Sequence, residues 1–315
     1  MQSEHTGGRL VVVGNFDGVH LGHQRVLGAA ARRARELALE PIALTFFPHP
    51  AEVLTRRTPA LLTTLERRAE LVARVDPALR LVVERFDESL AAQSPDQFAE
   101  SLLADKLGAR VVLVGENFRF GRDRQGDLEV LKALGARLGF VADSEPLAGD
   151  ATGAFSSTRI RKTVESGDVH GAARMLGRPH SLSGKVARGD GRGRLLGFKT
   201  ANLADVSEAR PENGVYACAV DRRGPDGYVR QGVGVVNIGV RPTFEAGPSI
   251  EVHLLDFDAD LYDDVLRVHL LARIRAEIRF EGAEALKQQI SLDVERARSL
   301  TGRVAPDPAA GAAWF

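Results

Sequence analysis

The sequence predicts two domains of different fold class: an α/β domain with a parallel sheet, then a small all-β barrel with a C-terminal helix. The chain has 315 residues, which is too long for one ordinary domain and suits two. In the first half, apolar strand-like runs alternate with helical patterns, whereas short strands separated by turn residues follow in the second half. We place the boundary at about residue 179, so that the domains cover residues 1–179 and 180–302.

The first domain begins with an all-apolar run, residues 10–13, which ends at Gly14 and is typical of a strand buried on both faces. Residues 22–40 then carry apolar side chains at helical spacing. The further elements that we expect are strands at residues 42–47, 81–83 and 110–114 and helices at residues 65–75, 98–107 and 128–138. Such alternation predicts a doubly wound sheet whose ligand lies at the carboxyl ends of the strands, beside Gly14 and Gly115.

The second domain shows short strands at regular spacing. The expected strands cover residues 181–187, 215–220, 228–238, 250–256 and 265–271. Several short strands of this kind predict a small closed barrel, and a helical pattern at residues 286–297 closes the domain. Residues 303–315 are rich in Ala, Pro and Gly, and we expect them to form a flexible tail.

Composition excludes several classes of function. Lys+Arg and Asp+Glu both number 42, so no general nucleic-acid or anionic-membrane surface is expected, because both need excess basic charge. The single cysteine, Cys218, excludes an internal disulfide and a cysteine-based zinc site. The first residues lack the apolar core of a signal peptide, and no apolar run is long enough to span a membrane. We therefore expect a cytoplasmic protein with small-molecule partners. No oligomeric state follows from the sequence.

A ten-residue motif, GNFDGVHLGH at residues 14–23, joins the first strand to the first helix. Glycines at such a turn let a phosphate approach the backbone, and the helix N-terminus supplies amide donors and a positive dipole. His20 and His23 lie three apart and can donate hydrogen bonds to a phosphate whose charge rises in a transition state. The alternative is that both histidines are structural or surface residues. The candidate phosphate-binding residues of the motif are Gly14, Phe16, Asp17 and Gly22.

A second motif, SSTRIRK at residues 156–162, places hydroxyls where they can cap a helix and cations just inside it. Cations in a first turn oppose the helix dipole, which favours an anion bound between them. The alternative is an ordinary N-cap followed by a solvated basic face. We expect a triphosphate to be held between the histidines and this turn, with Ser157, Thr158, Arg159 and Arg161 as its ligands.

Together these motifs resemble the nucleotidyltransferase superfamily, which carries His-x-Gly-His and a later Ser-Ser/Thr motif. The segment GENFRFG at residues 115–121 narrows the resemblance to the bacterial bifunctional riboflavin kinase/FAD synthetase family. Asn117 and Arg119 follow a strand and are candidates for ATP binding, whereas Phe118 and Phe120 are equally compatible with the core.

A glycine- and arginine-rich stretch, GDGRGRLLGFKTAN, covers residues 189–202. Phe198 separates Gly197 from Lys199 and Thr200, so the stretch is no P-loop. It is either a generic mobile loop or a flap in which Gly189, Gly191 and Gly197 admit phosphates. In the flap, Thr200 and Asn202 present oxygens to Mg²⁺, which prefers hard oxygen ligands shared with substrate phosphates.

Glu251 lies on an expected strand, two residues before His253 and on the same face. By itself it could pair with an arginine. However, the segments GRPHSLSGKV, GDGRGRLLGF-x-TANL, NIGVRPTF and EVHLLDFDADLY resemble the riboflavin kinase module in its expected order. The resemblance covers about residues 10–300. It departs from the family pattern at Phe47, at Lys199 and at the pair Asp263 and Asp264.

The resemblance implies a Rossmann-like nucleotidyltransferase domain followed by a riboflavin-kinase barrel. It also implies two reactions with ATP as co-substrate and Mg²⁺ as cofactor: riboflavin to FMN in the barrel, and FMN to FAD with release of pyrophosphate in the first domain. Glu251 would then be the general base of the kinase, and His20 and His23 the catalytic groups of the transferase. One rival is a kinase whose first domain binds nucleotide without transferring it, and another is a regulatory protein without turnover.

Overall fold

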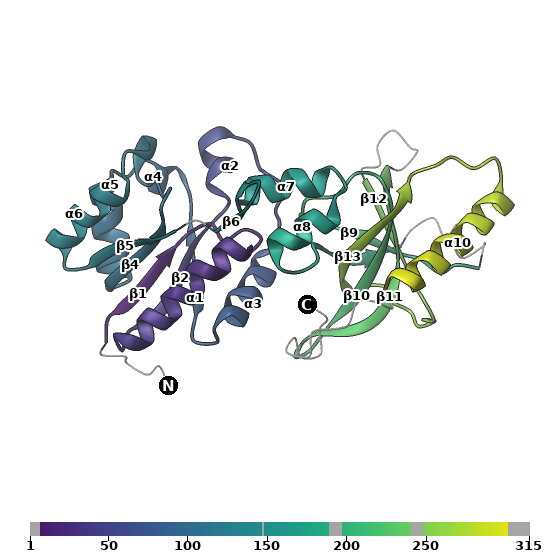
Figure 1. The fold of residues 1–315 in the computed structure, drawn as a ribbon, viewed down its shortest axis with the longest axis horizontal. Helices are drawn as coiled ribbons and strands as arrows, with labels where there is room; N and C mark the ends of the chain where they lie inside the picture. The colour runs from purple at the N-terminus through teal and green to yellow at the C-terminus, as the bar shows by residue number, and fades with distance from the viewer. Residues whose placement is uncertain (1–6, 147, 189–196, 241–247, 302–315) are drawn as a thin grey trace. The chain divides into compact units, whose positions relative to one another are not determined.

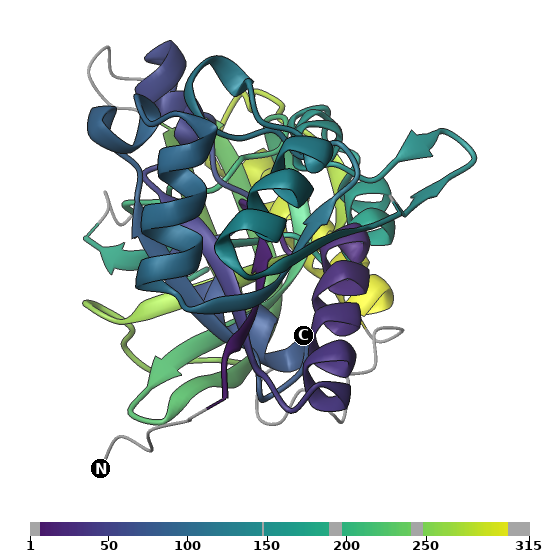
Figure 2. The same ribbon diagram turned by 90° about the vertical axis from the view of Figure 1, so that its left-hand side faces the viewer.

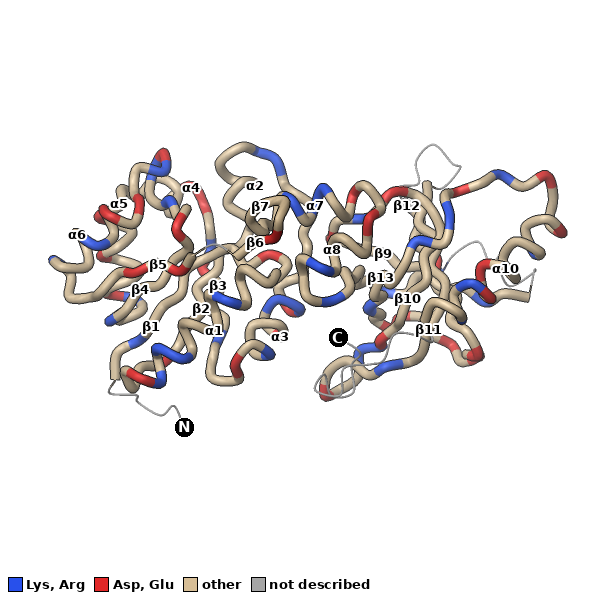
Figure 3. Tube along the Cα trace, viewed as in Figure 1, with Lys and Arg blue, Asp and Glu red and all other residues tan. Residues whose placement is uncertain are grey.

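The computed structural model describes residues 7–146, 148–188, 197–240 and 248–301. The chain folds as two compact units. The first comprises Met1–Pro59 and Leu65–Ser157, and the second comprises Ala60–Thr64 and Thr158–Phe315. Figure 1 labels helices and strands of both units, and Figure 3 marks the basic and acidic residues along the same trace.

The first unit contains a five-stranded parallel sheet in the order β3-β2-β1-β4-β5. Its strands are β1 (Arg9–Val13), β2 (Glu40–Phe47), β3 (Arg80–Arg85), β4 (Ala109–Gly115) and β5 (Val141–Glu145). The chain builds outward from β1 first through β2 and β3 and then, on the other side, through β4 and β5. Ligands of open α/β sheets bind where the strand order reverses in this way, so the loops that follow β1 and β4 form the expected site.

Helices cover both faces of this sheet (Figure 2). On one face, α1 (Leu21–Glu36) and α3 (Leu65–Val75) pack against the side chains of Leu10 and Val12. On the other face, the π-helix η1 (Ala99–Lys106) and α6 (Leu128–Leu138) pack against Val11, Val13 and Val112. β1 is apolar throughout its length after Arg9 because both of its faces are buried.

The shorter elements of this unit connect the main ones. They are α2 (Pro50–Thr55), α4 (Glu88–Ala91), α5 (Pro95–Phe98), η2 (Arg122–Arg124), β6 (Gly149–Asp150) and β7 (Gly153–Ala154). β6 and β7 pair with each other as a separate two-stranded sheet.

The second unit contains a closed barrel in the order β10-β11-β12-β9-β8-β13, in which neighbouring strands are antiparallel. Its elements are α7 (Ser157–Glu165), α8 (Val169–Leu176), β8 (Ser181–Ala187), β9 (Ala201–Ala204), β10 (Gly214–Gly224), β11 (Gly227–Val240), β12 (Pro248–Leu254), β13 (Val265–Ala276) and α10 (Ala283–Thr301). Alternate residues of each strand, such as Tyr216, Cys218 and Val220 of β10, fill the core. The predicted fold class, α/β followed by an all-β barrel with a C-terminal helix, is confirmed.

Two groups of residues outside the barrel strands belong to the barrel unit. Val169 of α8 lies in the apolar core of the barrel. The amide of Leu61 donates to the carbonyl oxygen of Ser207 (3.2 Å), and the amide of Ala209 donates to the carbonyl oxygen of Leu61 (2.6 Å). The compact units therefore change at Ser157 and Thr158, ahead of residue 179, where the sequence pattern changes. The boundary at residue 179 stays a prediction.

A pair of fragments tests this boundary. A fragment of residues 180–301 should fold, because its six strands close on a shared core, but it should melt earlier than a fragment of residues 158–301. The shorter fragment lacks Val169, and losing the burial of one core valine costs about 1.5 kcal/mol, which lowers the Tm of a domain of this size by roughly 5 °C. Circular-dichroism melting curves measure the difference. Equal melting temperatures would mean that α8 adds nothing to the barrel, and an unfolded shorter fragment would contradict the boundary at residue 179.

Candidate functional site

Two histidines lie at the N-terminus of α1. His20 is the N-cap residue, and its Nδ1 accepts a hydrogen bond from the backbone amide of His23 at 3.2 Å. Because Nδ1 is the acceptor, the ring proton of a neutral His20 sits on Nε2. The two imidazole rings stack with centroids 3.6 Å apart, and the ring of Phe16 meets His23 edge-on at 5.3 Å. The pair is thus held at the positive end of a 16-residue helix with no acidic residue in its first turn, which favours an anion there.

The glycines of this motif make room for the aromatic rings. A Cβ at Gly14 would lie 3.0 Å from the ring of Phe16, and one at Gly22 would lie 3.0 Å from the ring of His20. The backbone between them is strained, since Phe16 and Val19 have φ angles of +49° and +37°. Two glycines that allow close packing and two unusual backbone conformations therefore set the position of the histidines.

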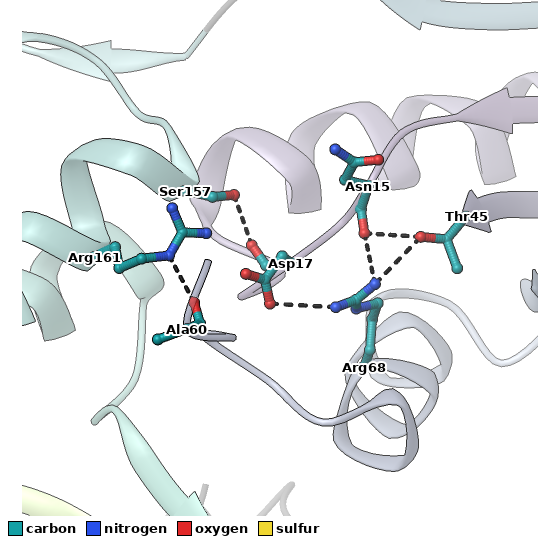
Figure 4. Close-up of polar contacts among 7 residues, drawn as sticks. All are labelled: Asn15, Asp17, Thr45, Ala60, Arg68, Ser157 and Arg161. Atoms are coloured by element: carbon teal, nitrogen blue, oxygen red, sulfur yellow. Dashed lines mark hydrogen bonds and ion pairs between the residues drawn. The ribbon is translucent and has the colours of Figure 1, made fainter. Parts of the chain in front are cut away.

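A buried ion pair holds the same loop from beneath (Figure 4). A guanidinium nitrogen of Arg68, in α3, lies 3.3 Å from the Asp17 carboxylate, and both side chains are almost fully buried. Another nitrogen of Arg68 donates to the carbonyl oxygen of Asn15 at 2.9 Å, and the Thr45 hydroxyl donates to that carbonyl at 2.8 Å. Burial lowers the pKa of the Arg68 guanidinium, and the charge of Asp17 opposes that change. The Asp17 carboxylate thus contacts Arg68, while phosphate binding by Asp17 stays a prediction.

Removing the Arg68 guanidinium should lower the stability of the fold. We expect Arg68→Met to destabilise the protein by about 3–5 kcal/mol, because the Asp17 carboxylate would stay buried without its counter-charge. Chemical denaturation measures the loss, and the double variant Asp17→Asn/Arg68→Met should recover part of it. Arg32→Met, at an exposed position of α1, is the matched control. A stable single variant would show that the pair does not hold the loop.

The second motif begins at the same loop. The Ser157 hydroxyl, in the first residue of α7, donates to the carbonyl oxygen of Asp17 at 2.8 Å (Figure 4). Thr158, Arg159 and Arg161 follow in α7 and belong to the barrel unit. There the Nε of Arg161 donates to the carbonyl oxygen of Ala60 at 2.7 Å. The structure thus brings Ser157 to the GNFDGVHLGH loop, and the phosphate contacts of the other three stay predictions.

The segment that follows β4 contains both buried core residues and exposed candidates for the nucleotide site. Phe120 is buried and packs against Phe98, with ring centroids 5.4 Å apart, and Phe118 stacks on Phe120. Asn117 and Arg119 are exposed beside them. Because β4 pairs in parallel with β1, this exposed segment and the histidine loop follow the same edge of the sheet.

In the barrel unit, three polar residues form a row across neighbouring strands. Glu251 of β12 lies opposite Asn202 of β9 and opposite Asn237 of β11. Residues directly opposite each other in an antiparallel pair share one face of the sheet. Ala201 and Val252 lie opposite each other on the other face and belong to the barrel core. Glu251 and Asn202, predicted separately from sequence, are therefore neighbours on the outer face.

A cavity of about 280 Å³ opens beside this row. Its polar lining includes Thr200 and Asn202, together with Lys199 and Asp258. Its apolar lining includes Val186, Val252, Leu254, Phe257, Leu261 and Tyr262. Apolar walls with a few polar groups at one side are typical of small-molecule sites. The hydroxyl of Thr200 and the amide oxygen of Asn202 are hard oxygen donors that line the same cavity, so these residues fit a magnesium ion shared with substrate phosphates.

The segment before Thr200 is anchored at several points. His253 Nδ1 lies 2.8 Å from the carbonyl oxygen of Lys199, and the His253 ring meets Phe198 edge-on at 5.4 Å. The Lys199 ammonium forms an ion pair with Asp258. Gly197 has a φ of +90°, which suits glycine. At Lys199, the departure from the family pattern thus adds an ionic anchor to the segment.

The remaining positions are two predicted phosphate-binding glycines, the predicted tail, and the other departures from the family pattern. Gly189 and Gly191, and the predicted tail of residues 303–315, lie outside the described residues. Asp263 and Asp264 form surface ion pairs with Lys185 and Arg222, and Phe47 is 43% exposed at the end of β2.

Two other kinds of site are absent from the part of the chain that the structure describes. The described residues contain no group of three or more His, Cys, Asp or Glu that could hold a metal ion. No helix among them is both long and apolar enough to cross a lipid bilayer.

Comparison with known proteins decides the family. The family model described as FAD synthetase matches residues 2–159, and the model described as riboflavin kinase matches residues 176–301. The bifunctional riboflavin kinase/FMN adenylyltransferase of Pseudomonas fluorescens is 37% identical over 303 residues, which cover 95% of each chain. The chain belongs to the bifunctional riboflavin kinase/FMN adenylyltransferase family. The Haemophilus influenzae member is 36% identical, with 93% of this chain and 94% of that one covered.

A solved structure has a similar two-unit architecture over most of this chain. A Streptococcus pneumoniae protein described as a macrolide-efflux protein has a TM-score of 0.80 and 29% sequence identity, covering 93% of this chain and 94% of that chain. The likeness therefore extends over both units of the riboflavin kinase/FMN adenylyltransferase fold.

Sequence reasoning missed several residues beside the two sites. They are Thr45, Arg68, Asn237 and Ser249, whose contacts join positions far apart in the chain or two apart on one strand. One signal was available for Arg68. Arg68 falls on the apolar side of an amphipathic helix, one turn before Leu71 and Val72. An arginine at such a position is buried and therefore needs a partner of opposite charge.

Proposed function

We propose that each of the two units carries out one of two consecutive ATP-dependent reactions, riboflavin to FMN in the barrel and FMN to FAD in the α/β unit. The chain is an enzyme with riboflavin kinase and FMN adenylyltransferase activities. Two separate polar sites in one chain support the assignment of one reaction to each unit. These are the stacked His20 and His23 at the start of α1, and Asn202, which lines the cavity and has Glu251 opposite it on the neighbouring strand.

In the kinase site, the base is Glu251. Its carboxylate accepts the proton of the ribityl hydroxyl as that oxygen attacks the γ-phosphate of ATP, and ADP leaves as the bond between the γ-phosphorus and the bridging oxygen breaks. Thr200 and Asn202 would hold Mg²⁺, which neutralises charge on the phosphate oxygens when bound. Apolar side chains form the rest of the cavity lining beside Thr200 and Asn202.

In the transferase site, no protein nucleophile is needed. The phosphate of FMN attacks the α-phosphate of ATP, and pyrophosphate leaves. The Nε2–H of His20 and the ring of His23 stabilise the charge that grows on the α-phosphate, with the positive end of α1 behind them. Ser157, Thr158, Arg159 and Arg161 hold the remaining phosphates, and Asn117 and Arg119 contact the nucleotide from the end of β4.

The kinase-only alternative predicts a different product. The departure from the family pattern at Phe47 favours this alternative. Phe47 lies at the exposed end of β2. His20 and His23 stack on each other at the start of α1, which favours the bifunctional enzyme. Chromatographic separation of the flavins made from riboflavin and ATP distinguishes the two functions, because only the bifunctional enzyme makes FAD. We also propose that the enzyme works in the cytoplasm on small molecules, without a nucleic-acid partner, which its formal net charge of zero supports.

The proposed metal site makes its own prediction. Thr200→Val removes the hydroxyl at nearly constant volume, so it should raise the Mg²⁺ concentration needed for half-maximal kinase activity several-fold. The adenylyltransferase should keep its magnesium dependence. Titrations of Mg²⁺ in separate assays, one with riboflavin and one with FMN, measure both. An unchanged titration of the kinase would remove Thr200 from the metal site.

A further inference from the structure

Ser249 contacts the proposed base of the kinase. Along β12, Ile250, Val252 and Leu254 face the barrel core, so Ser249 and Glu251 share the opposite face. The Ser249 side chain is 5% exposed. Its hydroxyl donates a hydrogen bond to Oε1 of Glu251 at 2.9 Å.

A carboxylate base must present one oxygen in a fixed direction. The last torsion of a glutamate side chain is broad, so a free Glu251 would exchange its two oxygens and spread their directions. The hydrogen bond from Ser249 holds Oε1 and leaves Oε2 to take a proton. Both ends of the contact lie on one regular strand, which fixes their spacing better than a loop would.

We infer that Ser249 is a positioning residue of the kinase reaction, which holds Glu251 so that Oε2 receives the proton of the substrate hydroxyl. The inference rests on the assignment of Glu251 as the base under the proposed function. Ser249 itself touches no reacting atom and acts only through Glu251.

The test compares Ser249→Ala with variants that keep the hydroxyl or remove another buried serine. Ser249→Ala should lower the kinase kcat about 10-fold, because Glu251 would lose the hydrogen bond that fixes the direction of its carboxylate oxygens. The KM values for riboflavin and ATP should change less than about 2-fold, because substrate binding does not use this contact. Ser249→Thr keeps the hydroxyl and should restore most of the rate. Ser181→Ala, a buried position on β8, should leave the rate unchanged.

A double-mutant cycle separates this inference from the assignment of the base. If Ser249 acts through Glu251, then Ser249→Ala should slow wild-type enzyme but not the Glu251→Gln variant further. A slow Glu251→Gln variant with a normal Ser249→Ala variant would overturn the inference and leave the base assignment standing. A normal Glu251→Gln variant would overturn both.

Two further outcomes also count against Ser249. Losses that multiply in the double variant would mean that the serine acts independently of Glu251. A Ser249→Thr variant as slow as Ser249→Ala, at an unchanged melting temperature, would mean that the hydroxyl is not the group that matters. If Ser249→Ala does not fold, Ser249→Cys takes its place, and its weaker donor should give a kcat clearly below that of the wild-type enzyme.

Discussion

Replacing His23 by alanine should abolish formation of FAD from FMN while riboflavin phosphorylation continues. Removing a positioned group that stabilises transition-state charge costs about 10²–10³-fold in rate. His23 also supports the ring of His20 by stacking at 3.6 Å, so its loss disturbs both imidazoles. We therefore expect FAD synthesis to fall by at least the upper part of that range. Glu251 lies in the other compact unit, and the kinase should be spared.

The measurement uses two assays on one preparation, FAD from added FMN and FMN from added riboflavin. His170→Ala, at an exposed position of α8, is the control and should change neither rate. A melting curve shows that the His23 variant is folded. Equal loss of both activities in a folded His23 variant would be incompatible with two separate sites.

Glu251→Gln should reverse this pattern. Glutamine keeps the size of the side chain and can still accept the hydrogen bond from Ser249, but it cannot take up a proton. General-base catalysis contributes about 10²–10⁴-fold, and we expect the lower part of this range because phosphoryl transfer forms little bond to the attacking oxygen. Binding of riboflavin and ATP should change little, and synthesis of FAD from added FMN should continue.

Single-turnover kinase rates together with a melting curve decide the role of Glu251. Glu295→Gln, at an exposed position of α10, is the matched control. If Glu251 were only a structural partner on the barrel wall, its glutamine variant would melt earlier yet turn over almost normally once folded. A stable variant with a near-normal kinase rate would remove Glu251 from catalysis.

The fold was largely predictable where strands are buried on both faces. β1 and β4 appear in the sequence as continuous apolar runs. β5 was missed because its residues, VADSE, are mostly polar and only partly buried at the edge of the sheet. β9 was missed because Ala201–Ala204 is short and begins within residues 189–202, which we expected to be a loop or a flap. Edge and short strands lack the apolar pattern on which the prediction depends.

The site was predictable only where its residues are close in sequence. The spacing of His20 and His23 was sufficient to place both at the start of a helix. The contact between Asp17 and Arg68 spans 51 positions, and no local pattern links them. Glu251 and Asn202 were proposed separately, and only the pairing of β12 with β9 makes them neighbours. Chemistry that depends on strand pairing therefore needs the structure.

The central claim, that one chain performs both reactions at two sites, is tested most directly by a time course. The purified protein is incubated with riboflavin, ATP and Mg²⁺, and the flavins are separated by chromatography while pyrophosphate is measured. We expect that FMN appears first, that FAD follows, and that pyrophosphate is released in an amount equal to FAD. FMN that accumulates without FAD or pyrophosphate, in protein shown to be folded, would contradict the claim.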